Sequence, residues 1–266
     1  MANYGKVSSV TQRGLYEPFE LQVSRGQIAF HRNVTVFGFN ADVDTSQVTV
    51  WPLPSLITFP AAPLQMTVSS TNANDTSNGT GARTIVVQGL DANYNEVTEI
   101  VTMNGQTAVT MTAFLIRINY AYVATAGSGN GAAGDIYIGT GTVTAGVPVT
   151  TYDIIKFDYN TTITGSWTVP AGYTAYVSQG LFSAGQAGGS NQVQGRLLTR
   201  GTDNIRRTAA VTTLNNGVAD YVFEYPLAVS EKTTIEATAI GSSNNNGVSS
   251  MFILLLVANS YDAGHT

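Results

Sequence analysis

The chain has 266 residues, a formal net charge of −5, a hydrophobic content of 43%, a charged content of only 11%, and no cysteine. This length fits one large domain or two of ordinary size, and the hydrophobic fraction argues against disorder. The acidic balance argues against a nucleic-acid-binding protein, which would carry a basic stripe or patch. Without cysteine, disulfides and thiolate chemistry are excluded.

Residues 1–32 differ from the rest of the chain because they combine closely spaced charges with many apolar side chains. So many apolar residues are expected to lie against a surface. We therefore predict an extended N-terminal arm that contacts a partner through Arg13, Leu15, Tyr16, Phe19 and Arg25. The alternative is a first strand with a frayed terminus. The first residues lack the apolar segment of a secretory signal, so none is expected.

From residue 33 onward, short β-branched and aromatic runs alternate with turn residues, and no window sustains the apolar spacing of an amphipathic helix. The pattern predicts an all-β fold with two β-sandwich, jelly-roll-like units, at residues 33–160 and 161–266. Residues 149–160 are expected to connect them. Hairpin turns are predicted at Asp91–Glu96 and at Asn104-Gly105.

The segment Met251–Ala258 is the most apolar run in the sequence. An unbroken apolar run is typical of a strand buried on both sides. It is too short to cross a bilayer, which takes about 20 residues, so no membrane contact is predicted. We expect the core to cover one side and a neighbouring copy to cover the other, with Leu254 and Leu256 at the seam between subunits.

Catalytic and metal-binding patterns are sparse. The chain has only two histidines, His31 and His265, so a nucleophile–histidine pair and a zinc site both lack their usual residues. No catalytic, cofactor or metal site is predicted. The sequence Asp91-x-Asn93-x-Asn95 has the opening of a calcium loop, but Glu96 replaces the required glycine and Thr102 the bidentate carboxylate. A turn explains it better.

Three stretches, Val10–Val23, Gly81–Glu96 and Thr168–Tyr176, resemble virion structural proteins of tailed phages of marine bacteria and cyanobacteria. The resemblance implies a non-enzymatic protein without cofactors, located on the virion and most simply on the head exterior. As a capsid decoration or cement protein, a head fibre or a knob, it would bind the major capsid protein or another virion protein. Analogy with β-sandwich virion proteins favours a homotrimer over a dimer.

Two alternatives belong to other classes of function. A tail- or fibre-associated module that binds a receptor or glycan would show solvent-exposed aromatic side chains beside a cleft. A weak glycan hydrolase would show a close pair of partly buried carboxylates, for which Asp42 and Asp44 are the residues to inspect.

Overall fold

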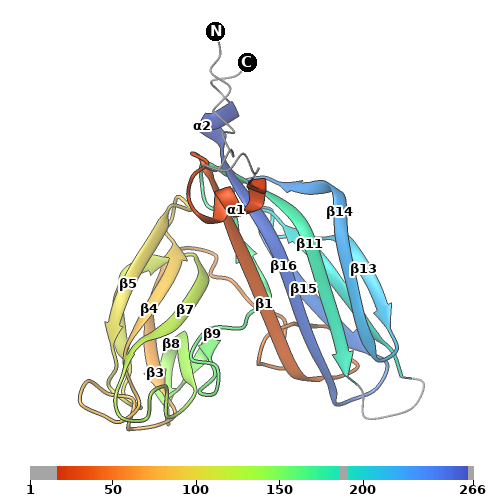
Figure 1. Ribbon diagram of the computed structural model, residues 1–266. Helices are drawn as coiled ribbons and strands as arrows, with labels where there is room; N and C mark the ends of the chain where they lie inside the picture. The colour runs from red at the N-terminus through yellow and green to blue at the C-terminus, as the bar shows by residue number, and fades with distance from the viewer. Residues whose placement is uncertain (1–16, 186–190, 263–266) are drawn as a thin grey trace.

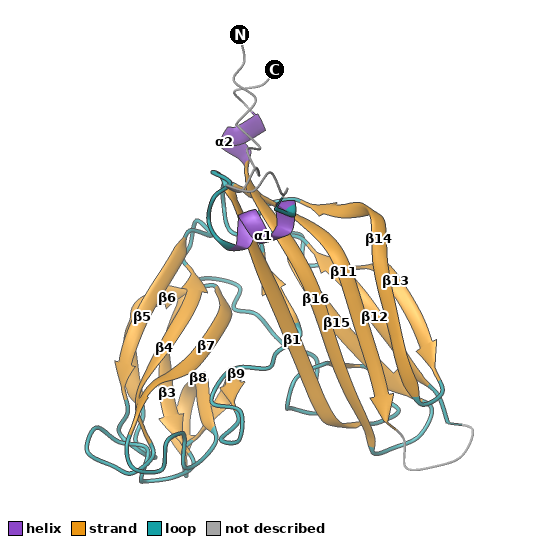
Figure 2. Cartoon of the chain, viewed as in Figure 1, coloured by secondary structure: helices purple, strands orange, loops and turns teal. Residues whose placement is uncertain are grey.

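The computed structural model describes residues 17–185 and 191–262, and over these residues the chain is almost entirely β, as predicted (Figure 1). Its antiparallel strands form four sheets, and its two helices are short (Figure 2). The elements are α1 (Phe19–Ser24), β1 (His31–Val43), β2 (Val48–Thr49), β3 (Leu64–Ser70), β4 (Ala82–Leu90), β5 (Glu96–Thr102), β6 (Val109–Leu115), β7 (Arg117–Ala126), β8 (Ile136–Thr144), β9 (Val147–Ile155), β10 (Ser166–Thr168), β11 (Tyr173–Gly185), β12 (Val193–Arg200), β13 (Arg206–Leu214), β14 (Gly217–Val229), β15 (Thr234–Gly241), β16 (Asn246–Ala258) and α2 (Asn259–Asp262).

The first unit consists of β3 to β9, in two sheets with the strand orders β6-β3-β8-β9 and β5-β4-β7. Both sheets contribute apolar side chains to one buried cluster, with Met66 and Ile138 from one sheet and Ile85 and Ala121 from the other. Met66 on β3 and Ala121 on β7 each lie between two less buried neighbours, which is the pattern of a sheet with one face in a core. The predicted hairpin at Asp91–Glu96 is confirmed, because β4 and β5 pair on either side of it.

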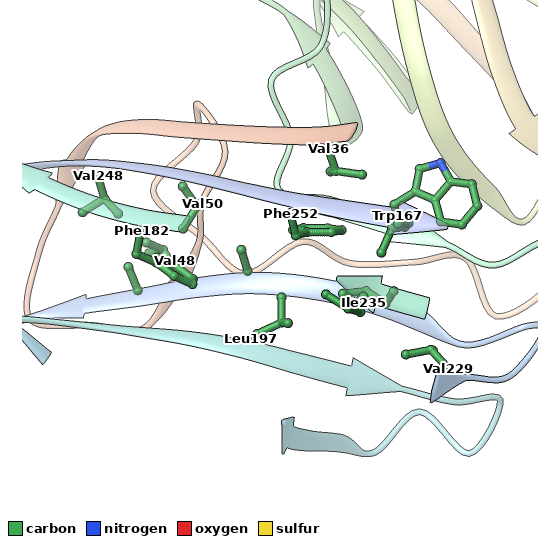
Figure 3. Close-up of a cluster of buried hydrophobic side chains, with 14 of the residues drawn as sticks. Val36, Val48, Val50, Trp167, Phe182, Leu197, Val229, Ile235, Val248 and Phe252 are labelled. Atoms are coloured by element: carbon green, nitrogen blue, oxygen red, sulfur yellow. The ribbon is translucent and has the colours of Figure 1, made fainter. Parts of the chain in front are cut away.

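The second unit pairs a sheet of order β1-β16-β11-β14 with a sheet of order β10-β15-β12-β13, in which β2 also lies beside β15. Figure 3 shows the core between them, where Val36 and Phe252 from the first sheet face Ile235 and Leu197 from the second. Trp167 closes one end of this core and is 6% exposed.

The strand pairing differs from the predicted division at residues 33 and 160. Strand β1 pairs along its length with β16, and β2 pairs with β15, so both belong to the second unit. The first unit is therefore inserted between β2 and β10. Local alternation of apolar residues identifies a strand but carries no information about its partner strand, which is why residues 33–50 were predicted to belong to the first unit.

Three local predictions also need correction. Residues 19–24 form a helix against β1 instead of continuing an extended arm, and Gln22 and Val23 of that helix are buried. The Asn104-Gly105 pair is not a hairpin turn, because β5 and β6 belong to different sheets; Gly105, at a φ of 60°, makes the crossing. Finally, β16 is not buried on both sides: from Asn246 to Leu256 its residues alternate between buried and half-buried.

Candidate functional site

The structure places only part of the predicted partner-binding arm. Arg13, Leu15 and Tyr16 lie outside the described residues. Phe19, on α1, is 38% exposed and lies edge-on to the ring of His31, with 5.8 Å between the ring centres. The guanidinium of Arg25 forms an ion pair with Glu17 within the same segment. Phe19 is thus available to a partner, whereas Arg25 already has an acidic neighbour.

Phe19 belongs to a group of aromatic rings at the end of the second unit where α1 and α2 lie (Figure 1). His31 lies 5.1 Å from Tyr261 and Phe30 lies 6.1 Å from it, measured between ring centres. Phe30 is 56% exposed. We call Phe19, Phe30, His31 and Tyr261 the apical aromatic cluster. Sequence reasoning missed it because Tyr261 comes from the opposite end of the chain.

Leu254 and Leu256, the residues predicted at a seam between subunits, are each 0% exposed within the single chain. Their side chains lie in the core between the two sheets of the second unit. They cannot contact another copy without opening that core, so this assignment is corrected. On β16 the outward positions are Met251, Ile253 and Leu255, which are half-buried.

A cleft of about 580 Å³ separates β1 of the second unit from β4, β5 and β7 of the first, and residues 161–164 also line it. We call it the inter-unit cleft. Its only charged lining residues among those described are Arg32 and Glu96, whose side chains meet at 2.6 Å and so join the two units. Uncharged polar and aromatic side chains make up much of the remaining wall, among them Asn33, Thr35, Phe37, Gln88, Thr98, Asn119, Tyr120, Thr161, Thr162, Thr164 and Trp167.

Two exposed aromatic rings stand in this cleft. Phe37 on β1 is 55% exposed, and Tyr120 on β7 is 40% exposed. The ring of Tyr122 lies 5.6 Å from that of Tyr120. Exposed rings beside hydroxyl and amide groups can stack on the apolar face of a sugar while hydrogen-bonding its hydroxyls. The chemistry of the cleft therefore suits a neutral polyol better than a charged ligand.

Two buried arginines, one from each unit, contact the same aromatic ring. The guanidinium carbons of Arg117, from the first unit, and Arg200, from the second, lie 4.3 and 4.4 Å from the centre of the Phe59 ring. Burial lowers the pKa of Arg117, and burial together with the neighbouring Arg206 lowers that of Arg200 to about 10. Glu236, which is fully buried, pairs with Arg206 at 3.0 Å and offsets part of this positive charge.

The acidic residues singled out in the sequence do not form a hydrolase pair. Asp42 is exposed, and Asp44 accepts a hydrogen bond from the backbone N–H of Asn245 at 3.1 Å. Neither is a buried acid. At the calcium-like sequence, the Asp91 carboxylate accepts hydrogen bonds from the backbone N–H groups of Asn93 and Asn95 at 2.8 and 2.9 Å, as expected of a turn.

Two carboxyl groups that the sequence did not single out are buried in the first unit. Asp75 accepts four hydrogen bonds, from Ser70 Oγ at the end of β3 and from the backbone N–H groups of Ala82, at the start of β4, and of Ala133 and Gly134. Asp153 accepts bonds from Thr164 Oγ1 at 2.6 Å and from Ile154 N at 2.9 Å. Burial raises the pKa of Asp153 to about 7.

Across residues 17–185 and 191–262, no three histidine, aspartate or glutamate side chains gather in a way that would hold a metal ion. In the same part of the chain, neither helix has the length and apolar character needed to cross a bilayer.

Comparison with known proteins gives no family assignment. No family model matches the chain, and no curated protein matches it. Among solved structures, T=1 particles derived from infectious bursal virus align over 86% of this chain and 70% of theirs, at 10% identity and a TM-score of 0.25. The VP2 subviral particle of infectious bursal disease virus aligns over 88% and 73%, at 10% identity and a TM-score of 0.23. TM-scores this low do not establish a common fold.

Proposed function

We propose that this chain is a non-enzymatic structural protein of a tailed-phage virion. The proposal starts from the resemblance of Val10–Val23, Gly81–Glu96 and Thr168–Tyr176 to such proteins. The structural observation that best supports it is the apical aromatic cluster. Exposed aromatic rings from both ends of the chain meet at one pole of the second unit, which is a suitable surface for attachment to a larger assembly.

In its finer form, the proposal is that the chain decorates the head exterior. The N-terminal region, including the segment that precedes α1, binds the major capsid protein or another virion protein at the apical aromatic cluster. The two-layer units act as rigid jelly-roll-like β-sandwich modules, and the second unit associates with other copies. Their number was expected to be three by analogy with virion proteins of similar architecture.

The test combines localisation with a matched pair of substitutions. Antibody against the purified chain should label the heads of intact particles. Phe30→Asp, at the apical aromatic cluster, should reduce retention of the chain on those particles at least tenfold, because it places a charge in an apolar contact. Aspartate tolerates the positive φ of 66° at position 30.

Phe114→Asp is the control, since Phe114 is 57% exposed, against 56% for Phe30, but lies on β6 of the first unit. It should leave retention unchanged. Label on the tail would remove the head assignment. Equal retention of both variants would show that the apical aromatic cluster is not the attachment surface.

A second function, glycan binding, is favoured by one observation: Phe37 and Tyr120 are exposed in a neutral polar cleft. In this alternative the chain is a tail- or fibre-associated module that binds a receptor glycan. Calorimetric titration with uncharged oligosaccharides released from the host cell surface should give saturable heat that is lost in Tyr120→Ala and kept in Tyr225→Ala. Tyr225 is 85% exposed on β14 and is absent from the cleft lining. Heat that is absent in the native chain, or that survives both changes, would rule out this use of the cleft.

A further inference from the structure

The outer face of the sheet β1-β16-β11-β14 carries an unusually apolar surface. In antiparallel strands, directly opposed residues point to the same side of the sheet. Strand pairing therefore arranges this face in three rows: Thr35–Ile253–Gln179–Val222, Phe37–Met251–Leu181–Asp220 and Phe39–Ser249–Ser183–Val218. We call these twelve residues the outer face. Seven of them are apolar, and only Asp220 is charged.

This face is open to solvent. Val222, Val218 and Phe37 are 74%, 64% and 55% exposed. The helix α1 lies over the next row, where Asn33 Nδ2 donates a hydrogen bond to Ser24 Oγ. Figure 1 shows α1 across the upper end of this sheet and the strands bare below it. The outer side of β16 thus lacks the cover that its apolar sequence led us to expect.

We propose that a second copy of this chain covers the outer face, with sheet packed against sheet about a twofold axis. The inference rests on the self-association in the proposed function. The contact between copies was expected at Leu254 and Leu256 and is now assigned to the outer face. Four strands spaced about 4.8 Å apart and three rows about 7 Å apart measure roughly 19 by 20 Å, or about 400 Å² in projection. That is about half of what each partner contributes to a standard interface, which is the size of a weak, transient contact.

The charge pattern supports an identical partner. Two copies of this face bring together apolar, hydroxyl and amide groups, and the one carboxylate, Asp220, accepts a hydrogen bond from Gln179 at 2.9 Å within its own copy. A strongly charged partner would find no complementary groups here. In the first unit, Ile100, Phe114 and Val149 are strongly exposed but lie on three different strands, β5, β6 and β9.

The proposed twofold contact also implies how many copies associate. When the same patch is used on both partners, the contact is isologous, and such a contact closes at two. A pair is therefore expected where analogy had favoured a trimer. Repetition of a weak pair on a particle surface would strengthen it through effective concentration.

The experiment is sedimentation equilibrium of the full chain up to about 500 µM, in the micromolar-to-millimolar range where weak contacts are measured. The native chain should approach the mass of a dimer. Val222→Asp should raise the dissociation constant at least tenfold, and Val218→Asp should do the same. Val149→Asp should leave it unchanged, because Val149 is 77% exposed on β9, a close match to Val222 at 74%. Circular dichroism melting of all variants checks that they fold.

The inference would be overturned if the native chain stayed monomeric or formed a trimer. It would also be overturned if the Val222→Asp variant dimerised as well as the native chain. These outcomes are separate from those for the proposed function. If Val222→Asp breaks the dimer but the chain is absent from virions, this contact is upheld and the virion role is rejected. If the chain labels particles but is monomeric, the virion role is upheld and this contact is rejected.

Discussion

Asp153 should make the first unit lose stability as the pH rises, and Asp153→Asn should remove that loss. Asp153 is 2% exposed on β9, and Thr164 Oγ1 and Ile154 N donate to its Oδ1. Burial outweighs these two bonds and raises its pKa from 3.8 to about 7. Between those values the folded chain keeps a proton that the unfolded chain releases, so a rising pH favours unfolding.

The size of the effect follows from that difference in pKa. At about 1.4 kcal/mol for each pH unit, the gap between 3.8 and about 7 corresponds to a loss of about 4 kcal/mol in the free energy of unfolding. The stability that protonated Asp153 contributes is fully present below pH 4 and is lost as the pH rises through 7. Above that range, this group causes no further change in the free energy of unfolding. Asparagine keeps an oxygen for Thr164 and Ile154 but does not ionise. The variant should therefore match the native chain at pH 4 and exceed its stability by up to about 4 kcal/mol at pH 8.

Urea unfolding at a series of pH values measures this directly. Trp51 is 2% exposed and packs in the same small cluster as Ile154, so its fluorescence reports on the surroundings of Asp153. Asp42→Asn, at an exposed position on β1, is the control for removal of a negative charge. Parallel pH profiles for the native chain and Asp153→Asn would refute the reasoning, as would an equal gain in the Asp42→Asn control.

Three further changes test other parts of the fold, each by its effect on the free energy of unfolding in urea. Asp75→Ala should cost about 3–5 kcal/mol, because it leaves three buried backbone N–H groups without an acceptor; a cost below about 1 kcal/mol would show that water replaces the carboxylate. Phe59→Leu should cost about 1–3 kcal/mol through two lost cation–π contacts, and unchanged stability would mean that the arginines do not depend on the ring. Leu254→Ala should cost about 2–5 kcal/mol, clearly more than Leu255→Ala, since Leu254 is 0% exposed and Leu255 is half-buried; equal costs would contradict the assignment of the two faces of β16.

The class of fold could be predicted from the sequence because alternation along single strands is a local property. The alternating residues of Lys232–Ala239 and Val193–Arg200 predict two strands, and these segments form most of β15 and β12. Strands β13 and β14 were missed. Their exposed residues mix valine and tyrosine with Arg207, Asp220 and Glu224, so neither face shows a clear apolar pattern. Both are edge strands, for which little burial is required.

The candidate sites depended on information that the sequence does not carry. The run Met251–Ala258 was predicted to be buried on both sides, whereas in the structure, as far as Leu256, the residues of one face are buried and those of the other are half-buried. The face that Leu254 occupies depends on pairing with β1 and β11. A shift of one residue in register would have exchanged the two faces. The inter-unit cleft could not be predicted either, because Phe37 and Tyr120 line the same cleft only as a result of the insertion of the first unit.

The insertion of the first unit between β2 and β10 also bears on synthesis of the chain. Phe37 of β1 pairs with Met251 of β16, a separation of 214 residues (251 − 37). At a synthesis rate of about 5–20 residues per second, β16 is made roughly 10–40 s after β1. During that time β1 lacks its partner strand. Strands β3 to β9 end at residue 155, so the first unit can fold before β16 has been made. A chain that stops short of β16 would therefore carry one completed unit and one open sheet, with the apolar side of β1 exposed to chaperones and to other nascent chains.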